Sequence, residues 1–116
     1  MGKFDEFTRF RQELNGKILQ RGNLGIKRFF ALDEQSYHPG ALDAKTKELL
    51  GLVASLVLRC DDCISYHLIQ CKERGARSEE LFETFNIALV VGGSIVIPHL
   101  RRAVDFLEEL EEKNKC

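Results

Sequence analysis

Tryptophan is absent from this chain of 116 residues, and proline occurs only twice. Few stretches alternate polar and apolar residues in the manner of half-buried strands, so strands are not expected to dominate. An excess of charge is also missing, because 17 basic residues stand against 18 acidic ones and the net charge is −1. Such a surface offers no general electrostatic attraction to nucleic acid or to an anionic membrane. We therefore expect neither as a partner.

Long apolar runs are lacking as well. The two longest, at 49–58 and 87–98, fall far short of the roughly 20 residues that a membrane-spanning helix needs. No basic-then-apolar signal segment opens the chain. We expect a soluble, cytoplasmic protein. The hydrophobic content of 44% is enough for one compact domain over residues 1–116.

What the sequence does contain is helical periodicity. In the first segment, apolar residues recur at steps of three and four: Phe4, Phe7, Phe10, Leu14 and Ile18. The predicted helices cover residues 3–20, 24–35, 44–58, 61–74, 78 to the break at 92–94, and about 95–113. The expected fold class is an all-α, single-domain bundle of five or six helices.

The helix predicted at 44–58 has the pattern of a buried central helix, because its second half is apolar on every side. Glu48, Gly51 and Ser55 share one side of it and form the only break in the apolar surround. If this helix packs antiparallel against the helix at 61–74, that side faces its neighbour.

Three small residues in a row, Gly92, Gly93 and Ser94, interrupt the apolar C-terminal half of the chain. Small residues weaken a helix but let another backbone come close, so this segment could pack against a second subunit. An ordinary turn between two helices accounts for them equally well.

The stretch CDDCISYH at 60–67 carries the candidate chemistry. On a helix that turns about 100° and rises about 1.5 Å per residue, Cys60, Cys63, His67 and Cys71 form one stripe. Cα atoms three residues apart on a helix are roughly 5 Å from each other, within the range that a disulfide bridges. A dithiol that closes and opens is therefore geometrically available at Cys60 and Cys63.

A metal site and a purely structural role are also compatible with this stripe. Its four side chains are good zinc ligands, but about 16 Å of helical rise between Cys60 and Cys71 keeps all four from meeting at one ion. A zinc site on Cys60, Cys63 and His67 would need a ligand from elsewhere, and the candidates are Glu48, His38 and His99. In the structural role, the cysteines would simply be buried and His67 would fill a polar gap.

Catalysis by this stretch would require a thiolate, and a free cysteine has a pKa of about 8.5. A helix that begins at Cys60 would lower the pKa of that thiol. His67 follows Cys63 by four residues and is its nearest proton acceptor. The intervening Asp61 and Asp62 oppose ionisation, which favours a reducing pair over a strongly oxidising one.

Glu48 is the best candidate to orient His67, because histidine bases usually hydrogen-bond to a group that fixes their ring. Burial would raise the pKa of Glu48 into a range useful for proton transfer. The alternative is a solvent-exposed glutamate in the first turn of its helix.

Together Glu48, Cys60, Cys63 and His67 read E-x11-C-x2-C-x3-H. With its surroundings at 39–93, this pattern resembles the carboxymuconolactone decarboxylase superfamily, and within it the alkylhydroperoxidase D (AhpD)-like branch. The resemblance implies an all-α fold whose subunits associate as homo-trimers or hexamers, with the active site near an interface and no cofactor. It also implies a thiol-dependent peroxidase or disulfide reductase.

In the scheme that the resemblance implies, Cys63 attacks a small peroxide and becomes a sulfenic acid. Cys60 donates a proton and then closes the Cys60–Cys63 disulfide, while His67 and Glu48 shuttle protons. A protein disulfide is the other substrate implied, and a dithiol electron donor would regenerate the pair. The best-known peroxidase members carry a histidine where this chain has Asp62, and its loss favours disulfide exchange over peroxide reduction.

Two further function classes remain as alternatives: a lyase that decarboxylates a small carboxylated lactone, and a metal-binding protein without enzymatic activity. Decarboxylase members generally lack the cysteine pair, so the lyase is the less favoured. Cys71 and Cys116 have no counterpart in the motif. We expect Cys71 to serve in packing and assign no role to Cys116, and we expect His38 and His99 to be turn or cap residues.

Overall fold

The computed structural model of the chain describes residues 2–114 and is built from helices. In chain order these are α1 (Lys3–Arg21), α2 (Leu24–Ser36), α3 (Ala44–Leu58), α4 (Asp61–Glu73), α5 (Ser78–Gly92), the short 3-10 helix η1 (Ser94–Val96) and α6 (Ile97–Asn114). Six α-helices, with no strand among the described residues, confirm the expected all-α class. Within the same range no helix is long and apolar enough to cross a membrane. Cys116 lies outside the described residues.

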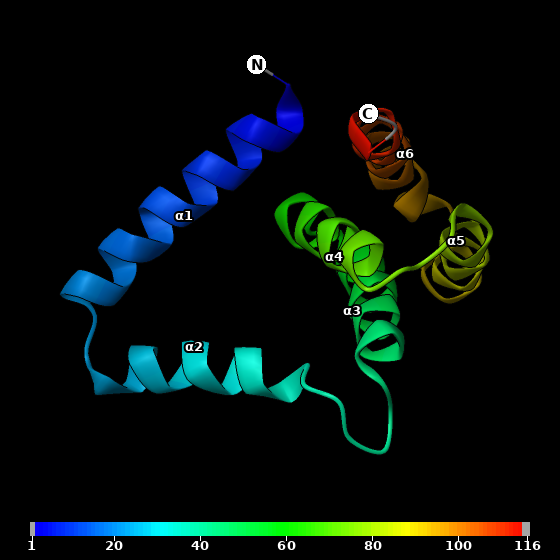
Figure 1. Ribbon diagram of the computed structural model, residues 1–116. Coiled ribbons are helices and arrows are strands. Elements are labelled where there is room, and N and C mark those ends of the chain that lie inside the picture. The colour runs from blue at the N-terminus through cyan, green and yellow to red at the C-terminus, as the bar shows by residue number, and fades with distance from the viewer. Residues whose placement is uncertain (1, 115–116) are drawn as a thin grey trace.

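Helices α3 to α6 form a bundle that contains the apolar core (Figure 1). α3 packs against α4 and α5, and α4 packs against α6. Leu52 and Leu56 of α3 and Leu68 of α4 are fully excluded from solvent. Every buried apolar side chain of the described residues lies between positions 52 and 110. The hydrophobic effect therefore stabilises this bundle far more than the first two helices.

The central position predicted for the helix at 44–58 is confirmed, but its burial on every side is not. Leu50 and Leu58 on its outer side are exposed. The physical reason is that α4 and α5 cover only part of the circumference of α3. The apolar residues on the uncovered side are in contact with solvent in the described structure.

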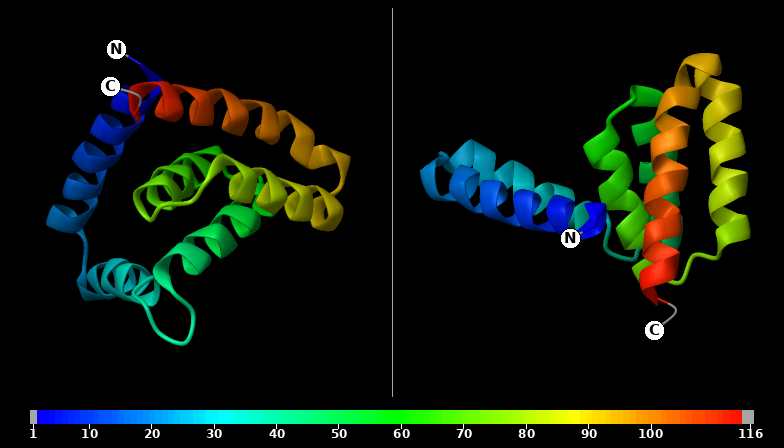
Figure 2. Two further views of the ribbon diagram at one scale, coloured as in Figure 1. Left: turned by 45° about the vertical axis from the view of Figure 1, so that its right-hand side comes forward. Right: turned by 90° about the horizontal axis from the view of Figure 1, so that it is seen from above.

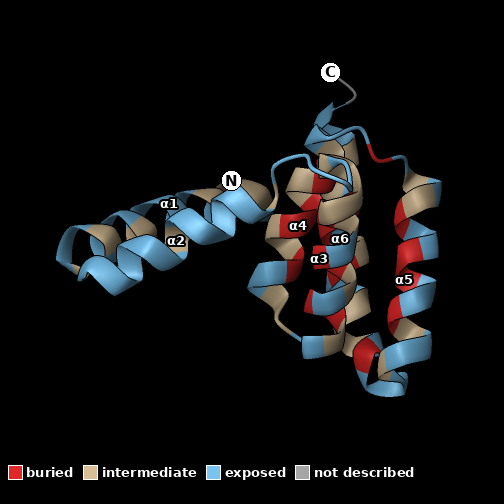
Figure 3. Ribbon diagram, turned by 90° about the horizontal axis from the view of Figure 1, so that it is seen from below, coloured by how far each residue is buried: buried red, intermediate tan, exposed pale blue. Residues whose placement is uncertain are grey.

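Helices α1 and α2 extend away from the bundle, and we call residues 3–36 the arm (Figure 2). Neither helix contains a buried residue, as the colouring of Figure 3 shows. The start of α1 is held by Glu109 of α6, whose carboxylate accepts the N–H groups of Lys3 at 3.0 Å and Phe4 at 2.6 Å. Phe7 then packs edge-to-face on Phe106, with 6.1 Å between the ring centroids.

Beyond this anchor the amphipathic pattern of the arm is left largely uncovered. Phe10 and Ile18 of α1 are exposed, and so are Phe29 and Leu32 of α2. An apolar stripe of this kind on a protein surface is typical of a region that a ligand or another protein covers.

The three small residues at 92–94 form a turn within the chain. α5 ends at Gly92, and Gly93 has a φ of +81°, a left-handed value that glycine adopts readily. A Cβ added to Gly92 would lie 2.5 Å from Cγ2 of Val96, so the close approach is to the chain itself. Of the two interpretations, subunit packing and an ordinary turn between helices, the described residues support the turn.

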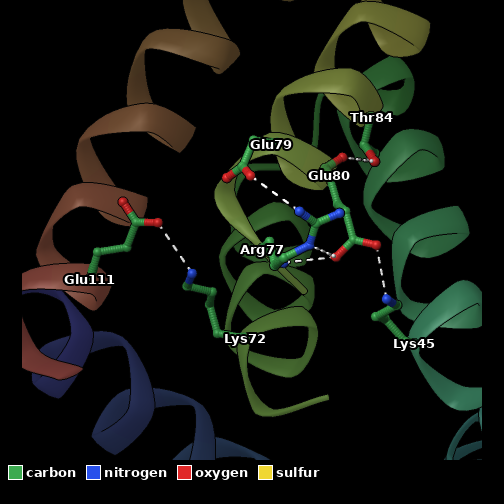
Figure 4. A network of polar contacts seen from close by, with 7 residues as sticks. All are labelled: Lys45, Lys72, Arg77, Glu79, Glu80, Thr84 and Glu111. Carbon is green, nitrogen blue, oxygen red and sulfur yellow. Dashed lines mark hydrogen bonds and ion pairs between the residues drawn. The ribbon is translucent and has the colours of Figure 1, made fainter. Parts of the chain in front are cut away.

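Polar contacts on the surface of the bundle fix how its helices are aligned (Figure 4). Lys45 of α3 pairs with Glu80 of α5 at 2.8 Å, and Lys72 of α4 pairs with Glu111 of α6 at 3.1 Å. The Glu80 carboxylate also accepts the backbone N–H of Arg77 at 2.8 Å, which caps the start of α5. Such partly exposed pairs add little stability. They join α3 to α5 and α4 to α6 at the edge of the core.

Candidate active site

The two candidate cysteines lie where α3 turns back into α4. Arg59 ends α3 in the left-handed conformation, with φ 60° and ψ 43°. Its N–H donates to the carbonyl of Leu56, and the N–H of Cys60 donates to that of Ser55, both at 3.0 Å. This is the usual hydrogen-bond pattern of a reversal at a helix end. It sends α4 back along α3 after only two residues, so the two helices run antiparallel.

Cys60 is the N-cap residue of α4, and its sulfur accepts the backbone N–H of Cys63 at 3.3 Å. The Sγ atoms of the two cysteines lie 2.6 Å apart, with both thiols free. A short movement would bring them to the bond length of about 2.05 Å of a disulfide. The predicted start of the helix at residue 61 is confirmed, with Cys60 as its N-cap. The prediction that Cys60 lies within the helical stripe is wrong, because the reversal places it before the first turn.

The environment of Cys63 holds its thiol in the protonated form. Partial desolvation and the adjacent Cys60 raise the pKa of Cys63 to about 11, and nearby carboxylates, among them Asp62, add to this. A reaction through a Cys63 thiolate therefore depends on a base that takes its proton.

A buried carboxylate of α3 and a buried imidazole of α4 face each other. Glu48 of α3 is 1% exposed and His67 of α4 is 8% exposed, and Oε1 of Glu48 lies 2.8 Å from Nδ1 of His67. The predicted side of α3 thus faces α4, and the alternative of an exposed Glu48 is wrong. Gly51 makes room for the ring, since a Cβ there would lie 2.6 to 2.9 Å from three of its atoms. Ser55 completes this side by donating its hydroxyl to the Gly51 carbonyl at 2.7 Å.

The second ring nitrogen of His67 points to a residue that the sequence did not identify. Nε2 lies 3.5 Å from the hydroxyl oxygen of Tyr37, the C-cap residue of α2. Tyr37 and Tyr66 flank the imidazole, with ring centroids 5.3 Å and 5.1 Å away. Among residues 2–114 no direct hydrogen bond joins His67 to Cys63, although both line the same cavity.

That cavity lies between the arm and α4 and has a volume of about 370 Å³. Its α1 wall includes Phe10, Leu14 and Ile18, so the space in front of Cys63 is largely apolar. Arg11 also lines it, with its guanidinium 4.0 Å from the centroid of the Tyr66 ring. Helical periodicity identified the apolar residues of α1 but gave no indication that they face the cysteines.

The two aspartates between the cysteines have different surroundings. Nδ1 of His99 lies 2.8 Å from Oδ1 of Asp61, and Arg102 lies 3.7 Å from the other oxygen of that carboxylate. Asp62 instead lines the cavity beside Cys63. The carboxylate of Asp61 thus has its polar partners on α6, whereas the charge of Asp62 acts on the Cys63 thiol. His99 lies in the first turn of α6, and its ring, not a capping interaction, makes this contact.

The described residues form no cluster of three or more His, Cys, Asp or Glu side chains that could hold a metal ion. Glu48 and His99, two of the candidate extra ligands, are hydrogen-bonded to His67 and Asp61. Cys71 is fully buried, and desolvation together with the charge of Glu48 raises its pKa to about 12. Its position in the core is the one expected of a packing residue.

With this geometry in view, comparison with known proteins gives a family. Residues 26–106 match the sequence model of the carboxymuconolactone decarboxylase family. The chain belongs to this family. The match is wider than the segment 39–93 that carried the resemblance in sequence, and it takes in most of α2 and the first ten residues of α6.

Crystal structures of family members agree with the fold over nearly the whole chain. The Thermotoga maritima protein TM1620 is 67% identical, with a TM-score of 0.93 over 95% of this chain and 96% of that one. A second structure of it describes a carboxymuconolactone decarboxylase family protein with a suggested involvement in antioxidative response. The family member lpg0406 of Legionella pneumophila is 29% identical, with a TM-score of 0.84 over 92% of this chain and 96% of that one.

A curated relative is more distant. Protein 4 in the cox locus of Paracoccus denitrificans is 29% identical over 83 residues, which cover 72% of this chain and 75% of that protein.

Proposed function

We propose that this protein is a thiol-dependent oxidoreductase of the AhpD-like type, which reduces a small peroxide or a disulfide through Cys60 and Cys63. The observation that carries the proposal is the pair of free sulfurs 2.6 Å apart at the start of α4. The description of TM1620 as a protein with a suggested antioxidative role supports the same chemistry.

The peroxide reaction proceeds in two steps at the cysteines. The Cys63 thiolate attacks the terminal oxygen of a hydroperoxide, the O–O bond breaks, and the products are a Cys63 sulfenic acid and an alkoxide that takes up one proton. The Cys60 sulfur then attacks the Cys63 sulfur, the S–S bond forms, and hydroxide leaves with a proton as water. A dithiol donor reduces the resulting disulfide and becomes a disulfide itself.

Glu48 and His67 supply the proton acceptor that Cys63 needs. In the proposed reaction Glu48 acts as a carboxylate, which can only accept a hydrogen bond. Nδ1 of His67 then donates across their 2.8 Å contact, and Nε2 is left as the basic nitrogen. The carboxylate also stabilises the imidazolium that forms when Nε2 takes up a proton. A buried pair of this kind functions as a fixed base and not as a mobile surface group.

Of the two proposed reactions, the surroundings of Cys63 favour disulfide exchange over peroxide reduction. Asp62 raises the pKa of Cys63 where a histidine would lower it. A thiol of higher pKa forms a more nucleophilic thiolate and is a poorer leaving group from its own disulfide. Both properties are those of a dithiol that reduces its substrate.

We also propose that the chain assembles as a homo-trimer or hexamer. The exposed apolar residues of the arm support this, as do Val90 and Val91 at the end of α5. Light scattering tests it, with three or six chains of 13.3 kDa as the expected mass. A monomer at micromolar concentration would contradict the proposal.

The test of function compares two cysteine variants. Cys63→Ser is expected to abolish turnover of a hydroperoxide or a disulfide, whereas Cys71→Ser keeps it, since Cys71 lies in the core. After treatment with one equivalent of hydroperoxide, mass spectrometry should locate a Cys60–Cys63 disulfide. Equal activity of the two variants would contradict the assignment of Cys63 as the reacting thiol.

Two further measurements distinguish the other function classes. Turnover of a small carboxylated lactone that survives alkylation of all thiols would indicate a lyase. Zinc that stays with the purified protein at one ion per chain would indicate a metal-binding protein.

A further inference from the structure

The basic nitrogen of His67 faces a phenol and not a thiol. Nδ1 is occupied by Glu48, and the hydroxyl oxygen of Tyr37 lies 3.5 Å from Nε2. This distance is at the long end of the hydrogen-bond range. Catalytic hydrogen bonds are often long in a resting enzyme and shorten when substrate binds. Because both nitrogens of His67 are directed to other groups, a proton that moves between Cys63 and this imidazole needs a carrier.

Tyr37 is held in this place by a contact from α3. The ammonium group of Lys47 donates to the backbone carbonyls of Ser36 at 2.9 Å and His38 at 2.7 Å, the residues on either side of Tyr37. Lys47 directly precedes Glu48 in α3. The same turn of helix therefore places the carboxylate on one nitrogen of His67 and fixes the backbone of the tyrosine that faces the other.

We propose that the Tyr37 hydroxyl is a catalytic member of the proton relay, placed between Nε2 of His67 and the reacting atoms at Cys63. The proposal rests on the function proposed above and extends it. The Cys63 proton passes to the Tyr37 oxygen as the hydroxyl proton moves on to Nε2. When the O–O bond breaks, the alkoxide takes the hydroxyl proton of Tyr37, and Nε2 returns its proton to the phenolate. The sum is a thiol and a hydroperoxide converted to a sulfenic acid and an alcohol.

The surroundings of Tyr37 keep its hydroxyl protonated at rest, as a proton relay requires. Desolvation, followed by the charges of Asp33 and Glu48, raises the pKa of Tyr37, and a negative charge on Cys63 contributes in the same direction. The phenol therefore stays protonated at neutral pH. Only a stronger base, such as a newly formed alkoxide, removes its proton.

The test compares two reactions of the Cys63 thiol in Tyr37→Phe, which keeps the ring and removes only the hydroxyl. The reaction with tert-butyl hydroperoxide releases an alkoxide that needs a proton, whereas an aromatic disulfide such as dithiobis(nitrobenzoate) releases a thiolate that does not. Loss of a general acid typically slows a reaction by about 10²-fold or more, and we expect at least about tenfold for the hydroperoxide. The disulfide reaction should change by less than about twofold, because ionisation of Cys63 is an equilibrium that does not depend on the route of the proton.

Two lysines of α3 provide a matched pair of variants. Lys47→Met releases the turn around Tyr37 and should slow the hydroperoxide reaction selectively. Lys45→Met removes only the ion pair to Glu80 and should leave both reactions unchanged.

Three outcomes would overturn the role of Tyr37. If Tyr37→Phe reacts with the hydroperoxide at the rate of the unsubstituted chain, the relay does not pass through the phenol, and the proposed function stands. If it slows both reactions equally, Tyr37 only supports the structure of the site. If the unsubstituted chain reacts with the disulfide but not with the hydroperoxide, the peroxide chemistry fails and the step assigned to Tyr37 fails with it.

Discussion

The bundle and the arm contribute to one site in different ways. The bundle holds every buried residue of the described chain and fixes Glu48, His67 and the two cysteines through the packing of α3 against α4. The arm has no buried residue, yet it supplies the apolar wall of the cavity, and the loop that leaves it supplies Tyr37. Helix packing thus sets the geometry of the reacting groups. The part that would meet a substrate in the proposed reaction is attached to that geometry by few contacts.

This difference has a consequence for dynamics. Elements with few buried apolar contacts open at lower free energy than a packed core. The arm is held by Glu109 at the start of α1 and by Lys47 after α2, and Arg11 between them contacts the Tyr66 ring of α4. Movement between these two points would change the cavity without disturbing the pair of Glu48 and His67.

The largest expected effect comes from truncating one leucine in each region. Leu56 is 0% exposed in the bundle and Leu32 is 61% exposed in the arm. Leu56→Ala should lower the free energy of unfolding by about 2.7–5 kcal/mol, because it leaves a cavity in the core. Leu32→Ala should change it by less than about 0.5 kcal/mol. Urea denaturation of both variants measures the difference.

Repeating the denaturation at several protein concentrations extends this comparison to the proposed second subunit. If a second subunit covers the arm, the cost of Leu32→Ala should appear as a midpoint that depends on concentration. A cost for Leu32→Ala that equals that of Leu56→Ala at every concentration would contradict the division into bundle and arm.

A glycine in each region gives the second test. A Cβ at Gly51 would meet the imidazole of His67, whereas one at Gly16 in α1 would meet nothing within 4 Å. Gly51→Ala should destabilise the protein by about 1–3 kcal/mol through overpacking and displace the ring from Glu48. Gly16→Ala should stabilise it by about 0.5–1 kcal/mol, because alanine is the better helix former. Thermal unfolding and the rate of the thiol reaction are measured on both variants. They show whether the position of the His67 ring depends on the absence of a side chain at residue 51.

Much of the bundle could be predicted because its signals are local. The predicted bounds of α3 and α4 differ from the observed ones by at most one residue, and the two-residue connection forces these helices to be neighbours. Helical geometry then suffices to place Glu48 opposite His67. The helix expected from about 95 begins instead with η1, because Gly93 redirects the chain before α6.

The contribution of the arm could not be predicted, because it depends on contacts between residues far apart in sequence. Tyr37 reaches His67 only through the path of the loop after α2 and the hold of Lys47 on that loop. Periodicity shows which face of α1 is apolar, but not what that face meets. The roles assigned to the cysteines remain predictions, whereas the contact between Glu48 and His67 is present in the structure.

A third prediction concerns the anchor of the arm. The Glu109 carboxylate accepts two N–H groups from the first turn of α1, where the helix dipole also favours negative charge. Glu109→Ala should cost about 1 kcal/mol, mostly as fraying of α1 and not as unfolding of the bundle. Hydrogen exchange should then speed up in α1 and stay unchanged in α3. The adjacent, exposed Glu108→Ala is the control, and faster exchange in both variants would show that this anchor is not specific.

The smallest expected effect tests how the charge of Asp62 acts on Cys63. The carboxylate disfavours the thiolate, so Asp62→Asn should lower the pKa of Cys63 and increase the thiolate fraction at pH 7. The rate of alkylation should rise by about two- to fivefold at neutral pH, the size expected for one partly solvated charge nearby. It should still increase by about tenfold per pH unit below the pKa, because only the thiolate reacts. Asp61→Asn should change the rate less, since that carboxylate already has Arg102 and a hydrogen bond to His99 as partners. If the two variants behaved alike, the arm-facing position of Asp62 would have no special influence on the thiol.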